Sequence, residues 1–310
     1  MEEGKMKIGV IGLGTIAQKA YLPLYTSHFS QHEWHFSTRN PDTLKRLGEK
    51  YGLGAKQLHT NWETLLGEVH AICVHTPTET HYSIIRPFIE KGIPVLVDKP
   101  LSESYQQTKE LIELAEGKNT PVMVGFNRRF APMIQQLSAV DDKNMLIVQK
   151  NQQNSTDFSV RFRIYDMMIH SIDTALYLMD DNNISVLHSE VIEEKGDFKR
   201  ASVLLKSSQQ TVIVSINNQS GAKRETVELQ STDGTYLIEN LSRMTKYSNE
   251  GALSKELGDW TETLEVRGFL PMIASFVSML EQNGELPVSY ESALLSHKIC
   301  EEIISNYENS

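Results

Sequence analysis

A lysine and an Asp-x3-His motif bring together the residue types that oxidation of an alcohol requires. Lys99 lies in the stretch VDKP, and Asp166 precedes His170 by four positions. A base must take the hydroxyl proton as hydride leaves carbon, and histidine has a suitable pKa of about 6.5. A cation polarises the carbonyl in the reverse direction. His170 and Lys99 fit these two roles, with Asp166 holding a substrate hydroxyl, although Asp-x3-His alone is also typical of a capped helix with a solvated histidine.

A glycine-rich turn near the start of the chain has the spacing that binds a dinucleotide. GLGTIA follows the apolar run Lys7–Ile11 and fits the pattern G-x-G-x-x-A. The first glycine permits a tight turn, the second lets backbone N–H groups approach a pyrophosphate, and the small alanine allows the helix to pack closely. A tight turn without a ligand is the alternative. The predicted cofactor-binding residues of this turn are Gly12, Gly14, Thr15, Ile16 and Ala17.

The end of the next apolar run indicates which nicotinamide cofactor binds. Dehydrogenases specific for NAD usually carry an acidic residue there, which binds the ribose hydroxyls. This chain has Thr38 and Arg39 instead. A hydroxyl and a guanidinium bind a 2′-phosphate, whereas a carboxylate repels it. The sequence therefore favours NADP over NAD, and a solvated Arg39 with NAD accepted is the alternative.

The residues before position 125 predict an α/β domain. Apolar runs at 7–11, 34–38, 71–76, 95–98 and 122–125 alternate with helical patterns, one of which begins at Pro41 after a capping Asn40. Strands that are apolar on both faces indicate a doubly wound parallel sheet. Ligands bind at the carboxyl ends of such strands, where Lys99 is placed. We therefore assign residues 1–124 to an NAD(P)-binding Rossmann domain.

The pattern changes after Gly125. A helix over 170–179 is followed by strand-like runs at 202–206, 211–217, 226–230 and 235–239, with Asp233-Gly234 as a hairpin turn, and helices over 270–282 and 292–307 follow. Consecutive strands joined by short turns predict an open, mainly antiparallel sheet. We assign residues 125–310 to an α+β domain that binds substrate and forms oligomers.

Charge and composition narrow the class of partner. The 310 residues contain 30 Lys and Arg against 40 Asp and Glu, a net charge of −10 that disfavours nucleic acid. No apolar run approaches the roughly 18 residues of a membrane span, and the acidic start MEEGKMK differs from a signal peptide. We expect a cytoplasmic protein that binds a small molecule. Asn154-Ser155-Thr156 fits the glycosylation pattern but is interpreted as a loop, and the two cysteines, Cys73 and Cys300, as core residues.

A cluster of histidines suggests a metal site but lacks its other features. His28, His32 and His35 are close in sequence, yet they share no clear face and no cysteine joins them. We interpret them as part of a solvated loop and expect no metal.

Seven stretches spread over nearly the whole chain resemble one family. They are IGVIGLGTIAQKAYLPL from residue 8, VHTPTETHYSII from 74, VDKPL from 97, GFNRRFAPM from 125, DMMIHSIDTALYLM from 166, RETVELQSTDG from 224 and LEVRGFLP from 264. The chain resembles the glucose–fructose oxidoreductase / inositol dehydrogenase / MocA family, and within it the bacterial MviM-type proteins. This resemblance implies a Rossmann domain followed by an open sheet that makes homodimers or homotetramers.

The resemblance also implies roles for individual residues. Lys99 would contact substrate and the nicotinamide ribose, His170 would accept the proton, and Asp166 would bind a substrate hydroxyl. The loop along the dinucleotide and the start of the substrate pocket would comprise Thr76, Pro77, His81, Asn127 and Arg128. Asp98 replaces the family's glutamate, and Met167 and Met168 replace smaller or polar residues. Asp173 could orient the imidazole of His170 or form a surface pair.

The sequence thus predicts an NAD(P)-dependent oxidoreductase acting on a secondary alcohol or ketone of a sugar, cyclitol or related metabolite. An NAD-dependent glycosidase of the same family is an alternative, in which transient oxidation permits elimination of a glycoside. A dinucleotide-binding sensor or regulator without catalysis is another.

Overall fold

The computed structural model describes residues 5–153, 156–181 and 183–310. The first four residues of the acidic start, and Asn154 and Ser155 of the expected loop, lie outside this description. The chain forms two compact units, one comprising Met1–Gly125 with Met272–Ser289 and the other Phe126–Pro271 with Tyr290–Ser310. Residues 272–289 therefore group with the first unit, whereas the sequence placed them in the second domain. Within the described ranges no helix is long and apolar enough to cross a membrane.

The first unit contains a parallel sheet of six strands in the order β3-β2-β1-β4-β5-β6. The strands are β1 (Lys7–Ile11), β2 (Glu33–Ser37), β3 (Leu58–His59), β4 (Ala71–Val74), β5 (Val95–Asp98) and β6 (Val122–Gly125). Every residue of β4 and β6 is buried, because helices cover both faces of the sheet. The order reverses at β1, which confirms the predicted doubly wound fold and places the ligand crevice at the carboxyl ends of β1 and β4.

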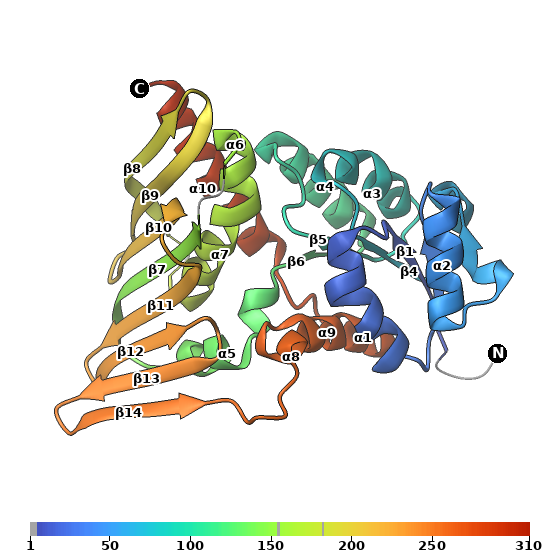
Figure 1. Ribbon diagram of the computed structural model, residues 1–310. Helices are drawn as coiled ribbons and strands as arrows, with labels where there is room; N and C mark the ends of the chain where they lie inside the picture. The colour runs from blue at the N-terminus through green and yellow to red at the C-terminus, as the bar shows by residue number, and fades with distance from the viewer. Residues whose placement is uncertain (1–4, 154–155, 182) are drawn as a thin grey trace. The chain divides into compact units, whose positions relative to one another are not determined.

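The helices of the first unit follow its strands along the chain (Figure 1). They are η1 (Ala17–Tyr21), α1 (Leu22–Ser27), α2 (Pro41–Tyr51), α3 (His81–Glu90) and α4 (Tyr105–Lys118), with short 3-10 turns η2 (Ala55–Gln57), η3 (Trp62–Leu65) and η4 (Thr78–Thr80). The Asn40 side chain caps α2 by accepting from Thr43 N at 3.0 Å. The helix that follows the glycine turn starts with a π-helical turn, η1, and continues as α1.

The second unit contains a mixed, mainly antiparallel sheet of eight strands in the order β14-β13-β12-β11-β7-β10-β9-β8. The strands are β7 (Lys143–Gln153), β8 (Ser185–Glu194), β9 (Asp197–Lys206), β10 (Thr211–Ser220), β11 (Arg224–Ser231), β12 (Gly234–Glu239), β13 (Arg243–Ser248) and β14 (Gly251–Glu256). Among the described residues of this sheet, only β7 and β10 pair in parallel. The open antiparallel sheet is confirmed, but β7, β8, β13 and β14 were not predicted, because polar residues dominate them; all six residues of β14 are exposed.

Helices cover one face of this second sheet, where α7 and α10 lie along it (Figure 1). The helices of the unit are η5 (Asn127–Phe130), α5 (Pro132–Ser138), α6 (Val160–Arg163), η6 (Ile164–Met168), α7 (Ile169–Leu178), α8 (Thr263–Val266) and α10 (Tyr290–Glu308), and α9 (Phe269–Gln282) begins here and continues in the first unit. Alternate residues of β10, Val212, Val214 and Ile216, are buried, so this face forms the core.

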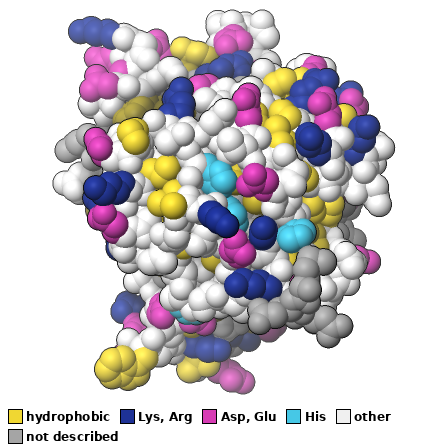
Figure 2. Space-filling model, turned by 90° about the vertical axis from the view of Figure 1, so that its right-hand side faces the viewer, with side chains coloured by type: hydrophobic (Ala, Val, Ile, Leu, Met, Phe, Trp, Pro, Cys, Tyr) yellow, Lys and Arg dark blue, Asp and Glu magenta, His cyan; other side chains and the backbone are white. Residues whose placement is uncertain are grey.

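Charged side chains of both signs lie interspersed on the face shown in Figure 2, with histidines among them. The two cysteines are buried, Cys73 on β4 and Cys300 on α10, as the sequence predicts. Burial raises the pKa of the Cys73 thiol to about 12, so this sulfur stays protonated. Neither cysteine is therefore a candidate nucleophile.

Candidate functional site

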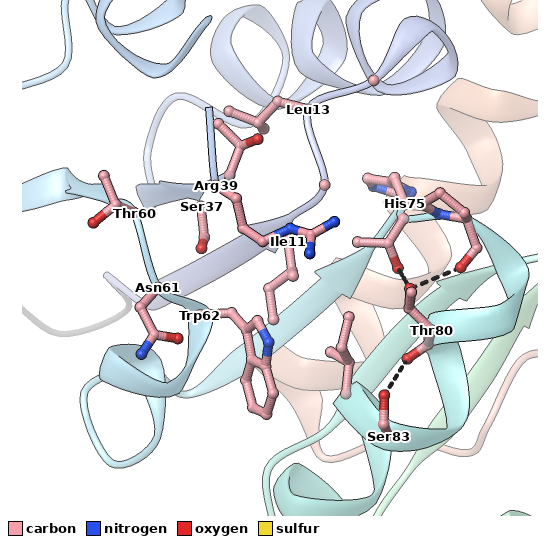
Figure 3. A pocket seen from close by; sticks show the side chains of 16 residues that line it. Ile11, Leu13, Ser37, Arg39, Thr60, Asn61, Trp62, His75, Thr80 and Ser83 are labelled. Carbon is pink, nitrogen blue, oxygen red and sulfur yellow. Dashed lines mark hydrogen bonds between the residues drawn. The ribbon is translucent and has the colours of Figure 1, made fainter. Parts of the chain in front are cut away.

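A cavity of about 580 Å³ lies in the first unit at the carboxyl ends of its central strands (Figure 3). Its walls include six of the residues predicted from the sequence, namely Gly12, Gly14, Thr38, Arg39, Thr76 and Pro77. Its volume suits a bound small molecule or part of a cofactor. The predicted cofactor residues Thr15, Ile16, Ala17, His81 and Lys99 are not among those that line it.

The glycine turn is shaped by contact with the neighbouring strand. Gly12 has φ +94°, and a Cβ there would lie 2.6 Å from Thr76 N. Only glycine fits this close approach. A Cβ on Gly14 would meet nothing within 4 Å, so the space beside its backbone is open. Ala17 is fully buried. This open space beside a helix start fits the pyrophosphate of a dinucleotide.

Polar and aromatic groups line the cavity beyond the end of β2. Arg39 is exposed and extends toward the middle of the cavity in Figure 3, with Asn61 and Trp62 across from it. The backbone of Thr38 is fixed by a hydrogen bond from its N to His59 O at 3.1 Å. Sequence reasoning missed Trp62. The available signal was a tryptophan within the polar stretch HTNWET. A large aromatic side chain in a polar segment has few apolar neighbours in sequence to pack with, which suggests a ligand contact.

The opposite wall is built by the residues that follow β4. Thr80 donates to Thr76 Oγ1 at 2.8 Å or to Pro77 O at 2.7 Å, and both contacts hold the loop in a tight turn (Figure 3). His75, also missed from the sequence, lines this wall and stacks on Tyr21 with ring centroids 3.8 Å apart. Its Nε2 contacts Tyr25 Oη at 2.9 Å. Burial lowers the pKa of His75 to about 3, so this ring is neutral at neutral pH.

Lys99 directly follows β5 and lies next to a carboxyl group. Lys99 N donates to Asp98 Oδ1 at 2.9 Å. Burial raises the pKa of Asp98, and the positive charge of Lys99 opposes that rise. His81 contacts the carbonyl oxygens of Thr76 and Pro100, each at 3.0 Å, and so ties the loop after β4 to the loop after β5. In the structure His81 connects two loops behind the cavity wall.

The second unit places His170 beside Arg128. Arg128 Nη1 lies 2.6 Å from His170 Nδ1. The same guanidinium forms a bidentate pair with Glu225, through Nε to Oε1 and through Nη2 to Oε2 at 3.0 Å. Burial disfavours ionisation of Glu225, but the charge and hydrogen bonds of Arg128 outweigh it and hold the pKa of this carboxyl at about 2. Sequence reasoning missed Glu225, because 97 residues separate it from Arg128.

Asn127 anchors the turn that carries Arg128. Its Nδ2 donates to Arg267 O at 2.7 Å. The next residue, Gly268, has φ +79°, and a Cβ there would lie 2.0 Å from Asn127 O. The turn η5 and the segment 267–268 are therefore packed backbone against backbone, and one amide hydrogen of the expected substrate ligand Asn127 is already used.

Asp173 forms a buried pair with Arg129. Asp173 is 1% exposed and accepts from Arg129 Nε at 2.9 Å and from Nη2 at 2.5 Å. Ser296 Oγ donates to the same carboxylate at 3.0 Å. The sequence left two roles open for Asp173, a surface ion pair or orientation of the His170 imidazole. The surface pair is wrong, because the ion pair with Arg129 lies in the core. The hydrogen bonds of the carboxylate described here are with Arg129 and Ser296.

Asp166 lies in the π-helical turn η6 that precedes α7. π-helical turns are rare in proteins, and those that occur often lie at functional sites. A second one, η1, follows the glycine turn of the first unit. Arg163 Nη1 donates to Asp166 Oδ2 at 3.5 Å, and the Asp166 side chain is 41% exposed. Met167 and Met168 are buried, so these substitutions belong to the core of the unit.

The three clustered histidines face different neighbours. His28 contacts Ser27, His32 contacts Glu281 Oε1 at 3.2 Å, and His35 contacts Glu33 Oε1 at 2.9 Å. Among the residues that the structure describes, no group of three His, Cys, Asp or Glu is placed to hold a metal ion.

Comparison with known proteins agrees with this fold. Residues 6–126 match an oxidoreductase family with an NAD-binding Rossmann fold, and residues 132–249 match a YceM-like C-terminal domain. The chain is 29% identical to a putative oxidoreductase YceM of Salmonella typhimurium over 96% of both chains. It is 24% identical to an inositol 2-dehydrogenase of Rhizobium meliloti over 93% of both chains.

A solved structure is similar over almost the whole chain. It is a dehydrogenase (MviM) from Clostridium difficile, with a TM-score of 0.91 and 30% identity, covering 97% of this chain and 99% of that one. The chain therefore belongs to the glucose–fructose oxidoreductase / inositol dehydrogenase / MocA oxidoreductase family. Within this family it is a dehydrogenase or reductase whose first unit is a dinucleotide-binding Rossmann fold.

Proposed function

We propose that the protein is an NADP(H)-preferring dehydrogenase or reductase that acts on a secondary alcohol or ketone of a sugar, cyclitol or related small metabolite. The observation that carries this proposal is the cavity of the first unit, whose glycine turn, open Gly14 backbone and Arg39 fit a phosphorylated dinucleotide. The similar inositol 2-dehydrogenase supports a polyol-like substrate.

The cofactor is held by the backbone of the glycine turn and by the ends of β2 and β4. Gly12 and Gly14 leave room for the pyrophosphate, and Thr38 and Arg39 bind the 2′-phosphate of NADP. Trp62 offers an aromatic face to the adenine. When bound, the nicotinamide ring accepts or donates hydride, and the chain supplies orientation and charge.

Lys99 and His170 act at the oxygen of the substrate, with Asp166 on a neighbouring hydroxyl. An ammonium and an imidazole are the groups that stabilise and exchange a proton with this oxygen. Lys99 belongs to the first unit and His170 to the second, so their joint action is part of the proposal. The residue types and the family resemblance support it.

A panel of polyols and sugars tests this function. We expect absorbance at 340 nm to change when the protein is mixed with NADP⁺ or NADPH and a suitable alcohol or ketone. Lys99→Ala and His170→Ala are expected to lower turnover by about 10²–10⁴-fold with dinucleotide affinity kept. Lys109→Ala is the matched control, because Lys109 lies on the exposed side of α4 and pairs with Glu113.

The outcomes separate the alternatives. Wild-type rates from both active-site variants would contradict the proposal. Dinucleotide binding with cleavage of a glycoside and no net absorbance change would indicate the glycosidase instead. Binding without any turnover would favour the sensor.

The family resemblance supports a further part of the proposal, a homodimer or homotetramer formed through the open sheet of the second unit. Among the described residues of its strands, Leu187 on β8, Tyr247 on β13 and Leu253 on β14 are large apolar side chains that are exposed. They lie apart, because β8 and β14 are opposite edges of the sheet and Leu253 pairs with Lys246 rather than with Tyr247, so they form no contiguous patch. Light scattering after size exclusion tests the proposed oligomer, and a 35.1 kDa species at micromolar concentration would contradict it.

A further inference from the structure

A chain of polar contacts joins strand β2 to the turn η3 through two histidines. His35 of β2 is buried, and its Nδ1 lies 3.1 Å from Nε2 of His59 on β3. The other nitrogen of each ring is used as well. His35 Nε2 lies 2.9 Å from Glu33 Oε1, and His59 Nδ1 lies 2.8 Å from Thr64 Oγ1. Four side chains from three consecutive elements are therefore linked end to end.

This chain of contacts ends at a wall of the cavity in the first unit. Thr64 Oγ1 also lies 2.7 Å from Asn61 O, to which its hydroxyl can donate. Thr60, Asn61 and Trp62 follow β3 directly and line one side of the cavity (Figure 3). Trp62 is the first residue of η3, and Asn61 caps that turn. The two histidines thus connect the sheet to the segment that we expect to contact the nucleotide.

The strand that carries this segment is short. β3 consists of two residues at the edge of the sheet, which pair with Phe36 and Ser37 of β2. A backbone hydrogen bond from Thr38 N to His59 O adds one more connection at 3.1 Å. Strands usually have at least three residues, so this pairing alone gives β3 little stability. The side-chain contact between His35 and His59 therefore contributes to the position of the segment.

The four contacts accommodate one added proton but not two. With both rings neutral, Thr64 Oγ1 donates to His59 Nδ1, and His59 Nε2 donates to His35 Nδ1. His35 Nε2 then donates to the Glu33 carboxylate. With one more proton, His35 Nδ1 donates to His59, and His59 Nδ1 donates to Thr64, whose hydroxyl turns to Asn61 O. With a second added proton, two N–H groups and two positive charges face each other at 3.1 Å, and the contact between the rings is lost.

We propose that His35 and His59 are positioning residues for the Asn61–Trp62 wall of the cavity, and that protonation of both rings releases this wall and weakens dinucleotide binding in acid. The inference rests on the proposed function for the identity of the ligand. The protein then binds its cofactor tightly near neutral pH and releases it as the pH falls.

The surroundings of the two rings determine where this release occurs. The charged groups of the elements that meet there are Glu33 of β2, Lys7 of β1, Lys56 of η2, Glu63 of η3 and Glu68 of the turn after η3. Burial and the neighbouring His35 lower the pKa of His59, and Glu68 opposes this only in part. A released, solvated His59 has the ordinary pKa of about 6.5. The released form therefore binds the second proton more readily, and acid below about pH 6.5 favours it.

Nitrogen NMR of the full-length protein without ligand tests the release directly. The protein is labelled with ¹⁵N-histidine and ¹⁵N-tryptophan and titrated from about pH 8 to pH 5. The signals that disappear in His59→Gln and in Trp62→Phe assign the His59 ring and the Trp62 indole. We expect the indole signal to move together with protonation of His59, with a midpoint below about pH 6.5. An indole signal that stays fixed while His59 takes up its proton would overturn the proposal.

The affinity for NADH gives the second readout. NADH is used instead of NADPH because a phosphate monoester itself titrates near pH 6. We expect the affinity of the wild type, measured by fluorescence titration, to fall about five- to tenfold from pH 7.5 to pH 5.5. His59→Gln keeps an amide that can meet His35 but has no ring to protonate, so we expect a fall of less than about twofold.

A matched control accompanies this comparison. His188→Gln makes the same change at an exposed histidine on β8 of the second unit, and its pH profile should follow the wild type. Equal pH profiles in the wild type and in His59→Gln would contradict the proposal.

His35→Phe separates positioning from titration. A phenyl ring fills the same buried space but cannot bond to His59, so we expect NADH affinity at pH 7.5 to fall about three- to tenfold. Unchanged affinity in a folded His35→Phe would contradict the positioning role.

The two readouts keep this inference apart from the proposed function. If the wild type binds no dinucleotide at any pH while the Trp62 indole follows His59, the proposed function fails and the positioning role stands. If the wild type binds NADH equally well at pH 7.5 and pH 5.5, the cofactor assignment stands and the inference fails.

Discussion

The cavity of the first unit is shaped by backbone, whereas the cluster of the second unit is made of side chains from distant parts of the chain. Gly12 presses against the backbone of Thr76, and Gly14 leaves open space. In the second unit, Arg128 meets Glu225 across 97 positions and His170 across 42. The first site depends on the positions of glycine residues in the sequence. The second depends on charged side chains that the fold brings into contact.

This difference reflects two requirements, one for binding the cofactor and one for the chemistry at the substrate. A dinucleotide offers phosphates and riboses common to many enzymes, so backbone N–H groups at a helix start can bind it. The substrate oxygen needs groups with defined protonation states, and buried ion pairs hold such groups in place. We therefore expect changes in the first unit to affect binding and changes in the second to affect stability and turnover.

The largest expected effect comes from breaking the buried pair of the second unit. Asp173→Ala leaves Arg129 buried without its carboxylate, and we expect it to lower the free energy of unfolding by about 3–5 kcal/mol. Urea denaturation followed by circular dichroism measures it. Glu90→Ala is the control, because its pair with Arg86 is exposed and solvent screens it, so we expect almost no loss of stability. Equal losses from the two variants would show that burial of the pair is unimportant.

Gly12→Ala tests the backbone site. The added Cβ would clash with the backbone of Thr76 and His75, and the positive φ itself costs roughly 1–2 kcal/mol. We expect dinucleotide affinity to fall by about 100-fold or more, measured by fluorescence titration. Gly117→Ala on α4, where a Cβ meets nothing within 4 Å, is the control. Wild-type affinity in Gly12→Ala would mean that the turn does not hold the cofactor.

The elements that the sequence predicted correctly are those specified by neighbouring residues. The turn from Gly12 to Ala17 and the cap at Asn40 each depend on a few adjacent positions, and both were found. The Arg128–Glu225 pair was not predicted, since strand pairing brings its members together. His75 was missed because a histidine at the end of a buried strand also suits a core position, which in part it is.

Strand prediction failed where side chains are polar on both faces. β14 has six exposed residues, and β8 alternates too weakly to distinguish it from a loop. The pairing that makes these segments strands comes from their neighbours in the sheet rather than from their own apolar pattern. The π-helical turns η1 and η6 were likewise beyond prediction, because π and α turns use the same residue types.

Acid should weaken the second unit through Glu225. The pKa of this carboxyl is about 2 in the folded protein against an ordinary 4.5. Its contribution, about 2–3 kcal/mol, is therefore fully present above about pH 4.5 and is lost as pH falls toward 2. The difference in unfolding free energy between wild type and Glu225→Gln, measured from pH 6 to about 2.5, should shrink over this window. A difference independent of pH would contradict the assignment.

The smallest expected effect concerns cofactor choice. Arg39→Ala removes a cation from the cavity, and we expect the affinity for NADPH to fall about tenfold with the affinity for NADH nearly unchanged. Arg46→Ala, on the neighbouring helix α2 and outside the cavity, serves as the control. An equal loss for both nucleotides would indicate that Arg39 contacts a part they share.

The central claim is that the first unit binds the cofactor and the second unit supplies a group for the chemistry. Its most direct test is one set of NADPH and NADH fluorescence titrations on the wild type, Arg39→Ala and His170→Ala. We predict that the wild type binds NADPH more tightly than NADH, that Arg39→Ala loses this preference, and that His170→Ala binds both like the wild type. If the wild type bound neither nucleotide, the dinucleotide assignment of the Gly12–Ala17 turn would be wrong.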